Sequence, residues 1–128
     1  MSVLDVDNRI SAKMPIGLLR RAADIILGKK YELSLVICGD ALSRSLNKRH
    51  RGKNKITNVL SFPLSKSSGE IFLNPRQATR ESKNFGRTHK NHLIALFIHG
   101  LLHLKGFDHG QKMDKREVSF KRQLRLRY

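Results

Sequence analysis

Apolar and polar positions along the chain change repeatedly between two periods, one typical of β-strands and one typical of α-helices. The strand-like period predicts four strands, at residues 3–6, 31–38, 57–64 and 70–73. The helical period predicts helices at residues 15–27, 40–48, 75–84, 88–105 and 111–128. Because helices and strands alternate and the last two strands form a hairpin, we expect an α/β (α+β) fold. Its helices would pack on one small mixed four-stranded sheet.

Residues with strong capping preferences set the predicted helix ends. Pro15 stands at the start of the first helix and Gly28 follows its end, positions where proline and glycine are favoured. Asp40 is expected to cap the second helix. Gly106 is placed to end the fourth helix, whose residues 93–98 are apolar on all sides. An all-apolar helix of this kind is buried among other elements.

The composition points to a small domain with an anionic partner. The chain has 128 residues, 39% of them hydrophobic, which is enough for one core. We therefore expect a single domain over residues 1–128. The 26 Lys and Arg against 10 Asp and Glu give a formal net charge of +16. Such a charge destabilises a compact chain by self-repulsion unless a polyanion binds it, so nucleic acid is the favoured partner.

A membrane protein does not fit this sequence. The longest apolar run has six residues, whereas a membrane-spanning helix needs about 20. Asp5 and Asp7 stand where a signal peptide carries positive charge. We therefore expect a cytoplasmic protein without a membrane partner. The one cysteine, Cys38, lies in an apolar run and is expected to be a buried small side chain rather than a nucleophile.

Three of the six histidines have the spacing of metal ligands. His99 and His103 are four residues apart in a predicted helix, so their rings leave the same face about one turn apart. Gly106 allows the chain to turn back, which can bring His109 to the third position of a tetrahedral site. The fourth position would stay open for water, as in catalytic zinc sites.

Core histidines with satisfied ring nitrogens are the structural alternative. Burying two imidazoles in an otherwise apolar helix has a desolvation cost that a metal or a set of hydrogen bonds must offset. We favour the metal site because three histidines share the pattern. The other three, His50, His89 and His92, show no partner pattern and are expected at the surface or in contact with phosphate.

The same histidine spacing occurs in zinc proteases of the metzincin type. Those enzymes carry a Glu directly after the first histidine, where it acts as the general base. Gly100 occupies that position here. Together with the net charge of +16, this favours a phosphodiester over a peptide as the substrate.

Two segments of the chain resemble the YbeY endoribonucleases, also called rRNA maturation factors. Residues 92–109 read His-Leu-Ile-Ala-Leu-Phe-Ile-His-Gly-Leu-Leu-His-Leu-Lys-Gly-Phe-Asp-His and are similar to the signature of that family. Residues 46–63 resemble its other characteristic block, and Gly69-Glu70-Ile71 stands where a Gly-Asp-Ile usually follows. The order and spacing agree over roughly residues 31–118.

This resemblance implies a zincin-like fold and one divalent metal ion, with zinc expected, held by His99, His103 and His109. It places the family's arginine at Arg51. It also implies cleavage of single-stranded RNA, maturation of the 3′ end of small-subunit ribosomal RNA, and a role in ribosome quality control. The implied partners are ribosomal RNA and the ribosome or its small-subunit proteins.

Charged residues outside the histidine motif have two possible roles each. Arg51 can clamp a phosphate by two parallel hydrogen bonds and stabilise the transition state, or it can be a solvated charge. Asp108 and Glu70 can orient a ligand histidine or accept a proton, although Asp108 can equally cap a helix. The helix at residues 112–127 is expected to follow phosphates. Five basic residues between positions 44 and 55 are also expected to bind phosphates: Arg44, Lys48, Arg49, Lys53 and Lys55.

Three functions remain open from these residues. The first is a metal-dependent endoribonuclease acting on ribosomal RNA, and the second is a non-catalytic RNA-binding ribosome-assembly factor that a metal stabilises. The third is a metallopeptidase whose base is Glu70. For stacking on RNA bases the candidates are Phe62, Phe72 and Phe107, although core packing is the role we expect for them.

Overall fold

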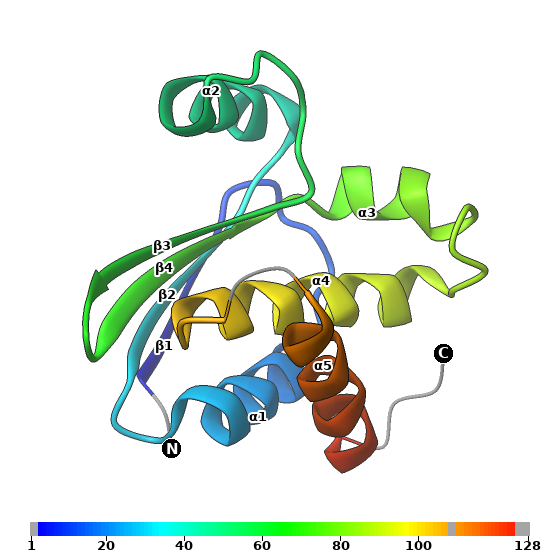
Figure 1. Ribbon diagram of the computed structural model, residues 1–128. Coiled ribbons are helices and arrows are strands. Elements are labelled where there is room, and N and C mark those ends of the chain that lie inside the picture. Colours follow the sequence, from blue (N-terminus) through cyan, green and yellow to red (C-terminus); the bar gives the residue numbers. More distant parts are fainter. Residues whose placement is uncertain (1–2, 108–109, 125–128) are drawn as a thin grey trace.

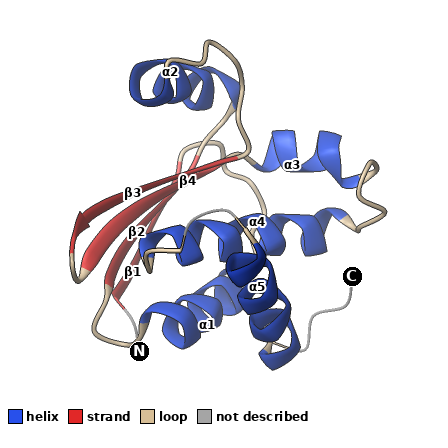
Figure 2. Ribbon diagram, in the orientation of Figure 1, coloured by secondary structure: helices blue, strands red, loops and turns tan. Residues whose placement is uncertain are grey.

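A computed structural model of the chain describes residues 3–107 and 110–124, which form four strands and five helices. The strands are β1 (Val3–Asn8), β2 (Glu32–Ile37), β3 (Val59–Ser65) and β4 (Ser68–Leu73). The helices are α1 (Ile16–Leu27), α2 (Asp40–Arg51), α3 (Pro75–Ser82), α4 (His89–Leu104) and α5 (Gln111–Gln123). This arrangement, coloured by element type in Figure 2, confirms the predicted fold class.

The sheet is mixed, and its strands follow the order β1-β2-β4-β3. β1 pairs in parallel with β2, and β2 with β4, whereas β3 pairs antiparallel with β4. The predicted hairpin at one sheet edge is thus confirmed. Pro63 lies in β3, near a register shift, as expected for a proline in an edge strand. β3 is therefore one edge strand of the sheet, and β1 is the other.

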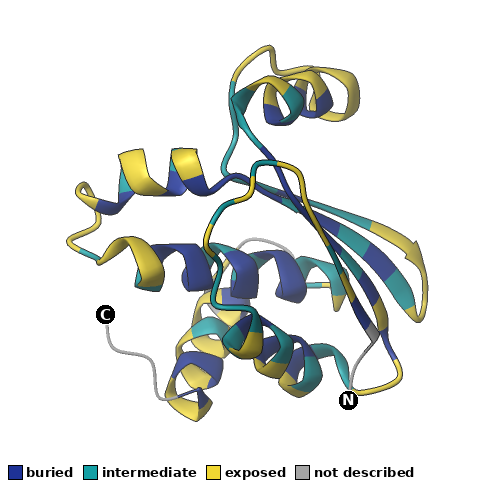
Figure 3. Cartoon of the chain, turned by 180° about the vertical axis from the view of Figure 1, so that it is seen from behind, coloured by how far each residue is buried: buried dark blue, intermediate teal, exposed yellow. Residues whose placement is uncertain are grey.

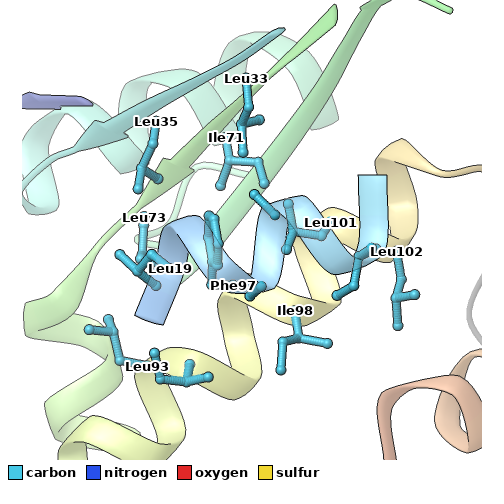
Figure 4. Packing of buried hydrophobic residues seen from close by; sticks show 14 of the residues in the cluster. Leu19, Leu33, Leu35, Ile71, Leu73, Leu93, Phe97, Ile98, Leu101 and Leu102 are labelled. Carbon is cyan, nitrogen blue, oxygen red and sulfur yellow. The ribbon is translucent and has the colours of Figure 1, made fainter. Parts of the chain in front are cut away.

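Helices cover the two faces of the sheet unequally. α1, α4 and α5 lie on one face, while α2 lies on the other (Figure 1). The hydrophobic core lies between the sheet and α1, α4 and α5. Buried side chains of β2 and β4, such as Leu35 and Leu73, pack toward Leu19 of α1 and toward Phe97 of α4 (Figure 4). α4 is buried along most of its length (Figure 3), as its apolar sequence predicts.

Gly100 lets α4 lie directly against the edge of the sheet. A Cβ atom at this position would meet Ser61 Oγ at 2.9 Å and Ile71 Cδ1 at 3.3 Å. The Ser61 hydroxyl donates a hydrogen bond to the Gly100 carbonyl oxygen, at 3.1 Å. A Glu here, as in metzincins, would therefore run into the sheet. The close approach also places the neighbouring histidines beside β3.

α2 is longer than the sequence predicted. It continues through Arg51 and ends at Gly52, which adopts a left-handed conformation with φ of 68°. The last turn consists of basic residues, Lys48 to Arg51, and cations are favoured where the carbonyl end of the helix dipole lies. The predicted helix end at residue 48, which left Arg51 outside the helix, was wrong.

Asp40 begins α2 but does not cap it; Gly39 is the capping position. The Asp40 carboxylate instead accepts hydrogen bonds from Arg80 of α3, including one of 3.1 Å from Nη1, and one of 3.0 Å from Asn74 Nδ2. Asp40 therefore ties α2 to α3. These hydrogen bonds, that of Arg80 first, lower the pKa of Asp40 below its usual value.

The two ends of the chain differ in how far they match expectation. α1 begins after Pro15 as predicted. α5 ends at Gln123, earlier than the predicted end at residue 128, and residues 125–128 lie outside the described part of the chain. Among the helices described, none combines the length and the apolar character needed to cross a membrane.

Candidate active site

A groove of about 760 Å³ lies between the edge strand β3 and helix α4. The end of α2 borders it, as do the loop between α3 and α4 and the α5 side chain Glu117. Its lining residues are His50, Arg51, Asn58, Val59, Leu60, Ser61, Phe62, Pro63, Phe85, Arg87, His92, Ala95, Leu96, His99, His103 and Glu117. Both described histidines of the predicted metal motif thus open onto one groove.

His99 and His103 present their Nε2 atoms to each other at 3.3 Å. Their ring centroids are 4.8 Å apart and the rings are nearly perpendicular, at 83°. Two nitrogens bound to one tetrahedral zinc, each at about 2.0–2.1 Å, would lie about 3.3–3.4 Å from each other. The pair therefore has the separation that two ligands of one zinc ion require.

The remainder of the predicted metal site lies outside the described residues. His109, the expected third ligand, and Asp108 both fall in the gap at residues 108–109. Within the described ranges, 3–107 and 110–124, no group of three or more His, Cys, Asp or Glu side chains is close enough to hold a metal. His99 and His103 thus fit two ligand positions of the predicted metal site, and His109 as the third ligand stays a prediction.

Glu117 of α5 is the site residue that the sequence reasoning missed. Its Oε2 lies 3.9 Å from Nδ1 of His99, the ring nitrogen that faces away from His103. Its Oε1 lies 2.8 Å from Nζ of Lys121, a side chain only 3% exposed. A carboxylate on the second nitrogen of a histidine ligand fixes the tautomer that leaves Nε2 to the metal.

The ionisation of Glu117 follows from these neighbours. Burial raises the pKa of Glu117, but interactions with His99 and Lys121 outweigh it, so the pKa lies below its usual value. A sequence signal existed: Glu117 follows Met113 by four residues and precedes Phe120 by three, and both are buried. A carboxylate at this spacing lies on or beside the buried face of an amphipathic helix.

His92 is buried, with 2% of its surface exposed, so the prediction of a surface or phosphate-contacting residue was wrong. Its Nε2 lies 3.2 Å from Glu81 Oε1, which also accepts a 2.9 Å hydrogen bond from Asn58. Burial raises the pKa of Glu81, but bonds from Asn58, His92 and Gln77 leave it lower than usual. His92 thus has an anionic partner on α3.

His50 and His89, in contrast, are exposed, as predicted. The His50 ring lies 4.6 Å from that of Phe62, and His89 Nδ1 lies 2.7 Å from the Thr79 hydroxyl. Phe62 in turn contacts Phe72 edge-on, at 5.8 Å. Phe107, the third predicted stacking candidate, is partly buried against the core.

Arg51 is exposed and lines the groove. A buried polar cluster fixes the segment that follows it. Ser43 Oγ donates to the Thr57 carbonyl oxygen at 3.1 Å, and Asn47 Nδ2 donates to that of Lys55 at 2.9 Å. The end of α2 is therefore held beside β3.

The other predicted RNA-binding residues lie outside the groove. They are exposed, and in the described structure none of them lines the groove: Arg44, Lys48, Arg49, Lys53 and Lys55. Arg44 Nε donates a 3.0 Å hydrogen bond to Asn54 Oδ1. These side chains form a basic surface on and after α2, next to the groove.

Glu70 is not brought to the histidine pair. Its neighbours in β4, Gly69 and Ile71, face α4: a Cβ on Gly69 would meet Leu104, and Ile71 lies against Gly100. Because side chains alternate along a strand, Glu70 points to the opposite face of the sheet. This removes the structural basis for a Glu70 role at the histidines, in a nuclease or in a peptidase.

Cys38 behaves as predicted. It is 1% exposed, and burial raises the pKa of its thiol to about 11. A thiol with this pKa is inert as a nucleophile near neutral pH. Cysteine chemistry is thus excluded from the site.

Fold and groove together define a class: a strongly basic α+β protein with a mixed four-stranded sheet and a histidine pair beside the edge strand. The solution structure of TM1509 from Thermotoga maritima has this fold, with a TM-score of 0.68 at 23% identity over 94% of this chain and 88% of that chain.

The model of the family Endoribonuclease YbeY matches residues 6–127. Endoribonuclease YbeY of Chelativorans sp. is 37% identical, covering 80% of this chain and 71% of the relative. That of Wolinella succinogenes is 35% identical, covering 93% and 85%. The chain therefore belongs to the endoribonuclease YbeY family, and the predicted membership in a family of nucleases is confirmed.

Proposed function

We propose that this protein is a metal-dependent endoribonuclease that cleaves single-stranded RNA in the groove between β3 and α4. The observation that carries the proposal is the pair of Nε2 atoms 3.3 Å apart on His99 and His103. This pair opens onto a groove that Arg51 also lines. Membership in the endoribonuclease YbeY family supports the same activity.

His99, His103 and His109 would hold the divalent metal, and zinc is the ion we propose among the several that imidazole ligands suit. When bound, such a metal activates water and offsets negative charge on a phosphate. In this proposal Glu117, whose Oε2 lies 3.9 Å from His99 Nδ1, would favour the tautomer that leaves Nε2 to the metal, and Lys121 balances the charge of Glu117. Within the described residues, Glu117 is the one carboxylate lining the groove, so repulsion of RNA there is small.

Arg51 binds the phosphate in this proposal. A guanidinium group can donate two parallel hydrogen bonds to phosphate oxygens and stabilise the charge that develops during cleavage. Its position at the end of α2, fixed by the cluster around Ser43 and Asn47, leaves its side chain exposed at the groove. The five basic residues beside it would follow neighbouring phosphates without reading bases.

The proposed biological substrate is ribosomal RNA, cut during maturation of the 3′ end of the small-subunit RNA, with a further role in ribosome quality control. Small-subunit proteins or the ribosome are the accompanying partners. The net charge of +16 supports an RNA-rich partner. Family membership supports the reaction.

The experiment compares protein stripped of metal by a chelator with the same protein reloaded with zinc, on single-stranded RNA carrying the small-subunit 3′ end and on a hairpin. We expect cleavage only of the single strand and only by the loaded protein. Tight RNA binding without cleavage in either state would identify a non-catalytic assembly factor instead. Equal cleavage with and without metal would overturn the metal-dependent part of the proposal.

A further inference from the structure

An aromatic side chain at the rim of the groove is left unexplained by the proposed reaction. Phe85 lies in the loop between α3 and α4 (Figure 1) and is 60% exposed. It lines the same groove as the histidine pair. Contact of a large apolar ring with water is unfavourable, so a ligand that covers the ring gains free energy from its burial.

The Phe85 ring is held in a fixed orientation. It stacks on the buried ring of His92, with centroids 5.0 Å apart and an interplanar angle of 19°. His92 is in turn anchored by Glu81. The guanidinium of Arg87 lies 5.6 Å from the Phe85 ring centroid. His92 therefore occupies one face of Phe85 and the Arg87 guanidinium also lies over the ring, while the residue as a whole is 60% exposed.

A flat aromatic surface beside arginines in a groove is the arrangement on which proteins stack bases of single-stranded nucleic acid. Arg51 and Arg87 both line this groove, and the chain carries a net charge of +16. An apolar or acidic peptide could contact the ring, but it would be attracted by the net positive charge of the protein less strongly than a polyanion is. Charge and shape thus select a nucleobase on a sugar-phosphate strand.

We propose that Phe85 is a base-stacking subsite for the RNA strand in the groove, supported from below by His92. This inference rests on the proposed endoribonuclease function for the identity of its ligand. His92 precedes His99 by seven residues on α4, about 10 Å along the helix axis. The stacked base therefore lies to one side of the cut bond, where it positions the strand and does not take part in the reaction.

The test measures the affinity of the full-length protein for a short single-stranded RNA and for an abasic strand with the same number of phosphates. Phe85→Ala should weaken binding to the RNA by about 5- to 150-fold, the range for loss of one stacked base. It should leave binding to the abasic strand unchanged. The matched control is Leu64→Ala, since Leu64 is 66% exposed on β3 but does not line the groove. This control should change neither affinity.

A second variant reports the contact directly. The chain contains no Trp, so Phe85→Trp introduces one fluorophore that keeps the aromatic surface. Its emission should be quenched by the RNA and not by the abasic strand, with affinity for RNA retained. If Phe85→Ala weakens binding to the RNA and to the abasic strand equally, or if RNA does not quench the emission of Phe85→Trp, the stacking subsite is overturned.

Failure of the subsite and failure of the nuclease proposal are distinguishable. In cleavage assays, Phe85→Ala should raise KM and leave kcat nearly unchanged, because stacking acts in binding. If the wild-type protein binds RNA through Phe85 but cuts nothing, the subsite stands and the endoribonuclease proposal falls. If the wild-type protein cuts RNA and Phe85→Ala matches Leu64→Ala in every measurement, the subsite falls alone.

Discussion

Gly100→Ala is expected to destabilise the protein even though alanine is the better helix former. The added Cβ would meet Ser61 Oγ at 2.9 Å and the side chains of Ile71 and Val59 at 3.3 Å. Overpacking of this kind costs about 1–3 kcal/mol, whereas replacing glycine by alanine inside a helix gains about 1 kcal/mol. The expected net loss is about 0–2 kcal/mol in the free energy of unfolding.

The matched control is Gly17→Ala in α1, where a Cβ would meet nothing within 4 Å. It should stabilise the protein by about 0.5–1 kcal/mol, so urea denaturation should separate the two variants by about 0.5–3 kcal/mol. Adding Ser61→Ala to Gly100→Ala removes the nearest atom, and the pair should be less destabilising than the sum of its parts. If Gly100→Ala is as stable as Gly17→Ala, α4 does not approach β3 as closely as described.

Three further predictions concern side chains around the groove. Arg51→Ala should lower the cleavage rate by about 10²–10³-fold, and Arg51→Lys should restore little of that rate. The control Arg49→Ala removes the same charge outside the groove and should cut RNA nearly as fast as wild type. Equal small losses in Arg51→Ala and Arg49→Ala would show that Arg51 only follows phosphates. Glu117→Gln should weaken zinc binding by about 10–100-fold, measured by competition with a chelating dye, and unchanged affinity would refute its role in orienting His99. Because the pKa of Asp40 is lower in the folded protein, its ionised form stabilises the fold above about pH 4, and this stabilisation is lost as pH falls through the folded pKa. Asp40→Asn should therefore lower the free energy of unfolding at neutral pH and reduce its decrease at acid pH, measured by urea unfolding at a series of pH values. An unchanged decrease at acid pH would contradict this.

Much of the fold could be predicted because local periodicity reflects burial directly. The apolar stretch at residues 93–98 indicated a buried helix, and α4 is buried along most of its length. The third helix was predicted to begin at residue 75, and the side chain of Asn74, directly before it, accepts hydrogen bonds from the backbone N–H groups of Arg76 and Gln77. These signals depend on neighbours within about one turn, which a sequence displays.

The parts of the site that could not be predicted depend on contacts between distant segments. Buried His92 is paired with Glu81 of α3, which also accepts a hydrogen bond from Asn58 before β3, and nothing near residue 92 in the sequence indicates either residue. Glu70 faces away from α4 because the glycine and isoleucine beside it face the helix. A shift of one residue in the alternation of a strand moves every side chain to the opposite face of the sheet. The sequence alone therefore did not determine on which face the Glu70 side chain lies.

The helix that carries Arg51 shows the same limit at close range. Gly52 lies beyond the helix predicted at residues 40–48, but it adopts the left-handed conformation that ends α2. Basic residues in a row are compatible with a loop and with the last turn of a helix. The bond from Asn47 to Lys55, together with the polar contacts of Ser43, decides between them. Arg51 is thereby placed at the groove.

The most direct test of the metal-dependent nuclease is the zinc content and RNA cleavage of His103→Ala. His103 provides one of the two converging nitrogens, and the remaining ligands hold a metal far less tightly than three do. The control is His89→Ala, an exposed histidine at the start of the same helix. His103→Ala should lose zinc and cleavage together, while His89→Ala should keep both. Full zinc occupancy and undiminished cleavage in His103→Ala would contradict this prediction.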